Sequence, residues 1–252
     1  MTDDEFDAML ARAADPNLIP GIYNYCDRRC ERCRFADRCF SHMESSKERD
    51  ARSVESTLDV LRIIAERQGI DLSGTPEEAA SSERGEDECE RRALTDPIVA
   101  LGKQYAMTTW PITRALWPIV MPRGDERVIN ALETIERLSS TISAKVFRAV
   151  WGTFQSDYDG TDLQSDSNGS AKVSRLFIAE SRGAWLVLME QGRATANGVP
   201  ARLVNMLDQL DAAMALRFPR AMEFVRPGFD TEPAETREDR DPALAVAPAG
   251  HA

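Results

Sequence analysis

The sequence lacks a long apolar run: none approaches the roughly 18–20 residues that span a bilayer. Its N-terminus, Met1-Thr2-Asp3-Asp4-Glu5, is acidic where a secretory signal would be basic and then apolar. Positive charge is also in the minority. The chain has 31 Lys and Arg residues against 42 Asp and Glu residues, which gives a formal net charge of −11. A general nucleic-acid binder would carry a basic patch or stripe instead. These absences predict a cytoplasmic protein that binds neither membrane nor nucleic acid.

Histidine is nearly absent. The only two histidines are His42 and His251, so the Glu-x-x-His pairs of di-iron helical bundles do not occur. The chain also has no Gly-x-Ser-x-Gly nucleophile elbow. On balance, the sequence favours a non-catalytic protein over an enzyme.

Strand patterns are missing as well, since no sustained apolar–polar alternation and no Asn-Gly hairpin between β-branched runs occurs. Apolar residues instead recur every three or four positions. The clearest series follows Asp125 and consists of Val128, Leu132, Ile135, Leu138, Ile142, Val146 and Ala149. The sequence therefore predicts an all-α bundle of about five principal helices, with the long ones antiparallel.

Further helices are expected on both sides of this segment. The predicted ranges are about 40–68, from Pro97 onward, about 170–191 with Asn168 or Ser170 as its N-cap, and about 198–219. Two Trp-Pro-Ile sequences place Pro111 and Pro118 in the second of these helices. Because proline removes a helix hydrogen bond, we expect a kinked or broken, buried elbow there.

Composition predicts the domain organisation. Residues 1–20 are expected to form a flexible acidic arm, and 21–226 a single helical domain. That domain would contain a cysteine-rich loop over 21–42 and a mobile, highly charged linker over 71–94. Residues 227–252, rich in Pro, Ala and charge, are expected to be a disordered tail.

Against these absences, one stretch is unusually rich in cysteine. Four of the five cysteines follow the spacing C-x3-C-x2-C-x5-C, and we call them the cysteine quartet: Cys26, Cys30, Cys33 and Cys39. In a cytoplasmic protein, clustered thiols indicate metal binding rather than disulfides. Closely spaced cysteines are typical of iron–sulfur loops, whereas structural zinc more often uses two separated knuckles. The quartet therefore predicts a [4Fe–4S] cluster, with zinc as the alternative.

The ligand set has a second solution. Cys30 and Cys33 with Cys39 and His42 would form an equally good zinc site and leave Cys26 spare. The fifth cysteine, Cys89, lies among acidic residues and is expected to be a thiol without a role in the site. Charged and aromatic residues interleave with the ligands and could offset their negative charge or exclude water: Arg28, Arg29, Arg32, Arg34, Arg38, Tyr23, Tyr25, Phe35 and Phe40.

The string Tyr-Cys-Asp-Arg-x-Cys-Glu-Arg-Cys over 25–33 resembles the opening of a group of uncharacterised bacterial proteins. Asn168-Gly-Ser-Ala-Lys-Val173 and Arg226-Pro-Gly-Phe-Asp230 also resemble theirs, so the similarity extends over about residues 20–230. The resemblance implies a bacterial origin and one continuous domain, but no activity.

Two hypotheses follow from these patterns. In the first, the cluster has a redox, sensing or structural role. In the second, zinc fixes the N-terminal region to the bundle in a non-catalytic interaction module. In either case we expect the partner to be another protein.

Overall fold

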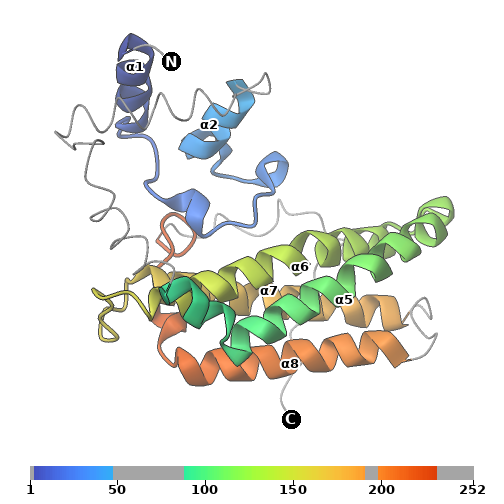
Figure 1. Cartoon of the computed structure of the whole chain (residues 1–252). Coiled ribbons are helices and arrows are strands. Elements are labelled where there is room, and N and C mark those ends of the chain that lie inside the picture. The colour runs from blue at the N-terminus through green and yellow to red at the C-terminus, as the bar shows by residue number, and fades with distance from the viewer. Residues whose placement is uncertain (1–2, 48–87, 191–197, 232–252) are drawn as a thin grey trace. The chain divides into compact units, whose positions relative to one another are not determined.

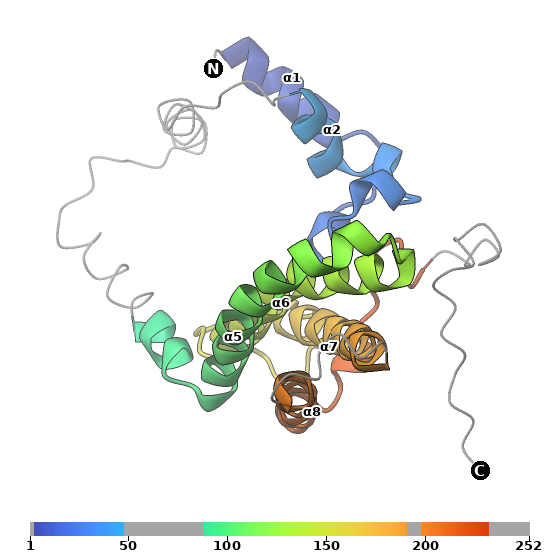
Figure 2. The ribbon, with the colours of Figure 1, turned by 90° about the vertical axis from the view of Figure 1, so that its right-hand side faces the viewer.

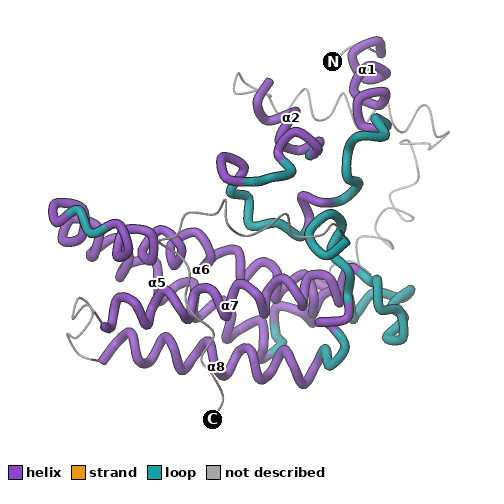
Figure 3. The backbone as a smooth tube through the Cα atoms, turned by 180° about the vertical axis from the view of Figure 1, so that it is seen from behind, coloured by secondary structure: helices purple, strands orange, loops and turns teal. Residues whose placement is uncertain are grey.

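The computed structural model describes residues 3–47, 88–190 and 198–231. Within these ranges every regular element is an α-helix or a 3-10 helix, as the colouring in Figure 3 shows, so the predicted all-α class is confirmed. The α-helices are α1 (Asp3–Ala13), α2 (Phe40–Lys47), α5 (Pro97–Val120), α6 (Glu126–Gly152), α7 (Asp166–Glu190) and α8 (Val199–Arg217). The 3-10 helices are η1 (Ile22–Asn24), η2 (Cys30–Arg32), η3 (Ala36–Arg38), η4 (Met121–Arg123) and η6 (Ala221–Glu223).

The described residues fall into two compact units rather than the predicted single domain. One unit combines the N-terminal residues up to Cys89 with Arg226–Thr231, which come from the other end of the described chain. The other is formed by Glu90–Val225. We call them the cysteine unit and the bundle unit.

The bundle unit consists of the four long helices α5–α8. Successive helices run in alternating directions (Figure 1), and contacts join α5 to α6, α6 to α7, α7 to α8 and α8 back to α5. Figure 2 shows the same helices turned so that α8 is seen nearly along its axis. The predicted antiparallel bundle is therefore confirmed for its long helices. No helix within the described ranges is both long enough and apolar enough to cross a bilayer.

Helix α6 follows its sequence pattern closely. Asp125 is its N-cap, and the carboxylate accepts hydrogen bonds from the amides of Arg127 and Val128. The whole predicted stripe is buried in the bundle: Val128, Leu132, Ile135, Leu138, Ile142, Val146 and Ala149. Burying seven apolar side chains of this kind is the main source of the helix's stability, at about 1.5–3 kcal/mol for each large one.

Helix α7 begins earlier than predicted, at Asp166 rather than near Ser170. Neither Asn168 nor Ser170 is its cap. Instead, the Ser165 hydroxyl accepts a hydrogen bond from the Asn168 amide, and Asn168 donates its side-chain amide to the Asp162 carbonyl. The residues in the first turns of α7 are small or polar, yet they are buried. In the sequence, such residues are more typical of a loop than of a helix.

Helix α5 contradicts the predicted elbow. It is continuous from Pro97 to Val120 with Pro111 and Pro118 inside it, and both prolines are exposed. Each ring removes the amide that would bond the carbonyl four residues earlier, at Met107 and Arg114. Those two residues are also exposed, so water can reach the carbonyls and the helix need not break.

A buried polar network joins α5 to α7. The Tyr105 hydroxyl lies 2.6 Å from the Ser181 hydroxyl and accepts a 3.0 Å hydrogen bond from the Trp185 indole nitrogen. All three side chains are fully buried. Burial raises the pKa of Tyr105 above its ordinary value, because the phenolate would lose its hydration there.

The cysteine unit begins with a helix where a flexible arm was predicted. Phe6 in α1 is buried, and Arg12 forms an ion pair with Glu44 of α2 at 3.1 Å. The predicted helix over 40–68 is present as α2 up to Lys47, and its remainder lies outside the described residues. So does the predicted linker up to residue 87, whereas residues 88–94 are helical with Ala93 fully buried.

Candidate metal centre

The cysteine loop is built from single turns of 3-10 helix. Cys30 opens η2, and Cys33 ends it by donating its amide to the Cys30 carbonyl. Because side chains three apart eclipse in a 3-10 helix, the two thiols lie on the same side of the turn. Cys39 follows η3 and precedes α2, and Arg28 adopts a left-handed conformation with φ of 59° between Cys26 and Cys30. These turns bend the chain back on itself around one space.

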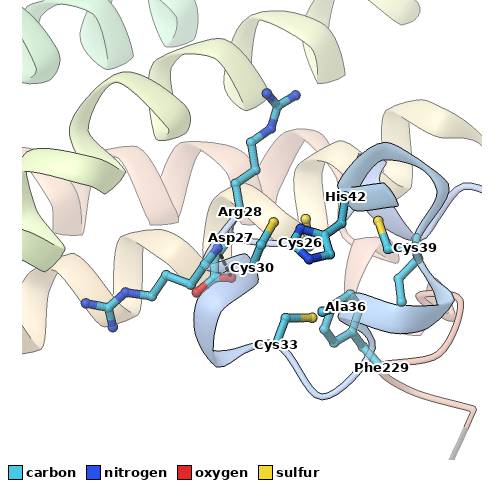
Figure 4. A pocket seen from close by; sticks show the side chains of 11 residues that line it. Cys26, Asp27, Arg28, Cys30, Cys33, Ala36, Cys39, His42 and Phe229 are labelled. Carbon is cyan, nitrogen blue, oxygen red and sulfur yellow. Dashed lines mark hydrogen bonds between the residues drawn. The ribbon is translucent and has the colours of Figure 1, made fainter. Parts of the chain in front are cut away.

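The quartet and His42 line one pocket. Its empty volume is about 300 Å³, including the part open to solvent. Figure 4 shows the four sulfur atoms and the His42 imidazole turned toward the same space. Cys39 is buried, and the other three cysteines are half-buried. The Cys26 thiol lies 3.6 Å from the Tyr23 carbonyl and donates a hydrogen bond to it.

The thiols influence one another's ionisation. Burial raises the pKa of Cys26 and of Cys30 above the ordinary thiol value, and neighbouring negative charges raise both further. Those charges include Cys39 for both thiols, and Cys33 for Cys30. Four thiolates in one pocket therefore repel one another unless a cation is bound among them, and a bound metal ion deprotonates the thiols that coordinate it.

One side of the pocket is apolar. Ile19, Ile22, Phe35 and Cys39 form a small buried core, against which Cys33 and Phe229 pack. The Phe35 and Phe229 rings meet edge to face with centroids 5.3 Å apart. The charged rim of the pocket consists of Asp27, Arg28 and Arg29, of which Arg28 is exposed. The thiols thus share the pocket with an apolar floor and a charged rim.

Phe229 belongs to a segment that the sequence predicts as tail. Residues 227–231 instead form an ordered loop in the cysteine unit, closed by ion-paired hydrogen bonds from Arg226 to Asp230. Gly228 has φ of 74°, and a side chain there would meet Ile19 and Ile22 at 3.0 Å. Residues 232–252 of the predicted tail lie outside the described part of the chain.

The interleaved arginines do not act as one group. Arg28 and Arg29 line the pocket, although the Arg28 guanidinium points away from the thiols in Figure 4. Arg34 lies over the Phe35 ring at 4.5 Å, and Arg38 donates a hydrogen bond to the Asn17 carbonyl. Of the predicted aromatic residues, Phe35 and Tyr25 are buried and Tyr23 is exposed.

The side chains of the pocket are not arranged as a ready-made site for a single metal ion. No three His, Cys, Asp or Glu side chains in the described ranges converge on one point suited to a single metal ion. All five cysteines lie in those ranges, and none forms a disulfide. Cys89 is in the helical segment 88–94 and does not line the pocket. The quartet surrounds a space and retains its thiols.

The structure thus brings every predicted site residue to one pocket: the quartet and the alternative ligand His42. It adds Phe229, for which the sequence offers no periodic signal, because the contact with Phe35 is made across the length of the chain. The phenylalanine within the Arg226-Pro-Gly-Phe-Asp string is the one feature that marks it. No protein-family model matches the chain, and no curated protein or solved structure is significantly similar to it.

Proposed function

We propose that the cysteine unit binds a [4Fe–4S] cluster through the quartet Cys26, Cys30, Cys33 and Cys39. The observation that carries this proposal is that four thiols from successive turns of one short loop line one pocket. Cysteine thiolates are the usual protein ligands of such clusters. The loop's sequence spacing and its backbone turns both favour a single shared centre.

The close sequence spacing of the quartet favours a cluster over one zinc ion. Structural zinc more often uses two short ligand pairs that are separated by a dozen or more residues. Three apolar residues that line the pocket, Ile22, Ala36 and Phe229, also suit a cluster, because its reduction potential depends on solvent exclusion.

Zinc is the second candidate, and His42 is the observation that favours it. The imidazole lies in the first turn of α2 and lines the same pocket as the thiols. With Cys30, Cys33 and Cys39 it would complete a Cys3His site. In that case the centre would be a structural one that holds the cysteine unit together as an interaction module.

The proposed role of a cluster is electron transfer, redox sensing or structural support, with another protein as partner. Bound there, a cluster would accept or release one electron at a time. The residues of this chain hold it, keep water from its apolar side and leave the charged rim at Arg28 and Arg29 accessible. Electron exchange with a partner protein would take place through that rim.

Metal analysis with an absorption spectrum, on protein purified without oxygen, tests the proposal. About four irons per chain and a brown solution are expected for the cluster. About one zinc and a colourless solution would replace the cluster with the zinc site. His42→Ala and Cys26→Ser then identify the ligand set, since only the variant that removes a true ligand lowers the metal content.

A further inference from the structure

The loop Arg226–Thr231 belongs to the cysteine unit and is closed by several contacts among its own residues. Arg226 and Asp230 are joined by side-chain hydrogen bonds of 2.9 and 3.2 Å, and the Asp230 amide donates to the Arg226 carbonyl at 3.0 Å. The Arg226 guanidinium lies 5.2 Å from the centre of the Phe229 ring, on its face. The Gly228 amide donates to the Thr231 hydroxyl. Such a loop holds its central side chain in a fixed position.

That side chain is Phe229, which lines the pocket of the quartet. Its ring packs on Phe35 and, like Cys33, against the small core that includes Cys39. The other pocket-lining residues lie between positions 22 and 42, so Phe229 comes from a distant part of the sequence. Its side chain is apolar and has no atom that could bind a metal. Its half-buried ring thus lies on the apolar side of the pocket, next to the core that includes Cys39.

We infer that Phe229 is a positioning residue of the metal centre. Its ring controls how readily water and competing ligands reach the quartet. This inference rests on the proposed metal centre. An apolar group beside metal ligands limits solvent access. Loss of an outer-shell group that hydrogen-bonds a ligand typically costs about 10–100-fold in metal affinity, and we place the effect of the apolar ring at the low end of that range. Removal of the ring would open the apolar side of the pocket while leaving all four thiols in place.

The test measures metal release from the full-length protein. Metal-loaded wild type and Phe229→Ala are mixed, without oxygen, with the coloured chelator pyridylazo-resorcinol, which binds both iron and zinc. We expect Phe229→Ala to release metal about tenfold faster. Phe229→Leu, which keeps an apolar group of similar bulk, should restore most of the slow release.

Phe154→Ala is the matched control. Phe154 is also half-buried and also lies beneath arginine side chains, those of Arg92 and Arg217, but it belongs to the bundle unit. Its release rate should equal that of the wild type. Should Phe229→Ala not fold, Asp230→Ala provides the same test, because it opens the loop and leaves the ring in the chain.

The outcomes separate the two proposals. Wild type without bound metal overturns the proposed function and this inference together. Wild type that binds metal, with Phe229→Ala or Asp230→Ala releasing it no faster than Phe154→Ala, overturns this inference alone.

Discussion

Two of the five cysteines, Cys30 and Cys89, lie in different surroundings. Cys30 lines the pocket, and its thiol interacts electrostatically with Cys33 and Cys39. Cys89 lies in the helical segment 88–94 and does not line the pocket. A residue of the same type should therefore contribute to metal binding at one position and not at the other.

We predict that Cys30→Ser abolishes metal binding and loosens the cysteine unit, because the loop between η1 and α2 has only a small apolar core of its own. Cys89→Ser should change neither property. Metal content and limited proteolysis of both variants provide the measurement. Similar effects of the two substitutions would contradict the ligand assignment.

The second residue-scale prediction concerns the hydroxyl of Tyr105. Tyr105→Phe leaves the Trp185 indole and the Ser181 hydroxyl buried without that partner, which should lower the free energy of unfolding by about 1–3 kcal/mol. Tyr158→Phe, at an exposed tyrosine, should have no effect. Urea unfolding followed by tryptophan fluorescence compares the two variants.

The burial of Tyr105 also predicts that the free energy of unfolding falls at alkaline pH. Because burial raises the pKa of Tyr105, the unfolded chain loses this proton near pH 10 while the folded chain still retains it. Above about pH 10 the unfolded state binds fewer protons, so stability is present below that pH and falls as the pH rises toward the folded pKa. The fall should be shallower in Tyr105→Phe; an equal slope in both proteins would exclude Tyr105 as its source.

At the scale of elements, the prolines of α5 provide a direct test. Pro118→Ala restores the amide that can bond the Arg114 carbonyl, so it should stabilise the bundle, by at most about 3 kcal/mol. Pro97→Ala is the control, since proline at a first helical position replaces an amide that has no partner within the helix. The shift in urea midpoint should be clear for Pro118→Ala alone. Equal midpoints would show that the interior proline costs the helix little.

The elements also show which features the sequence can predict. Helix α6 is predictable because its buried positions form one apolar stripe of constant period, and its N-cap is an aspartate. The start of α7 is not, because Ser167, Asn168 and Ser170 are buried by close helix contact rather than by their own hydrophobicity. The continuity of α5 through Pro111 is also missed, since it depends on which face meets solvent.

The candidate site divides in the same way. Its proposed ligands can be predicted from local spacing, because thiols within one loop are brought together by the turns between them. Phe229 does not, because its place depends on a contact with Phe35, far away in the sequence, and its neighbours have the composition of a tail.

At the scale of the whole molecule, the two units predict two separate responses. All four tryptophans, Trp110, Trp117, Trp151 and Trp185, lie in the bundle unit. Removal of the proposed metal with a chelator should therefore leave the fluorescence-detected unfolding midpoint unchanged while making α1 and the cysteine loop sensitive to protease. A shift of the tryptophan midpoint on metal removal would mean that the units unfold as one.

The cysteine unit is built from two segments that are far apart in the sequence, and this has a consequence during protein synthesis. Cys39 and Phe229 are about 190 positions apart in the sequence, and at about 5–20 residues per second their translation is separated by about 10 to 40 s. All four helices of the bundle are translated between the cysteine loop and Phe229. The cysteine unit can therefore make its full set of contacts only after the bundle helices have been synthesised, although its loop is made first.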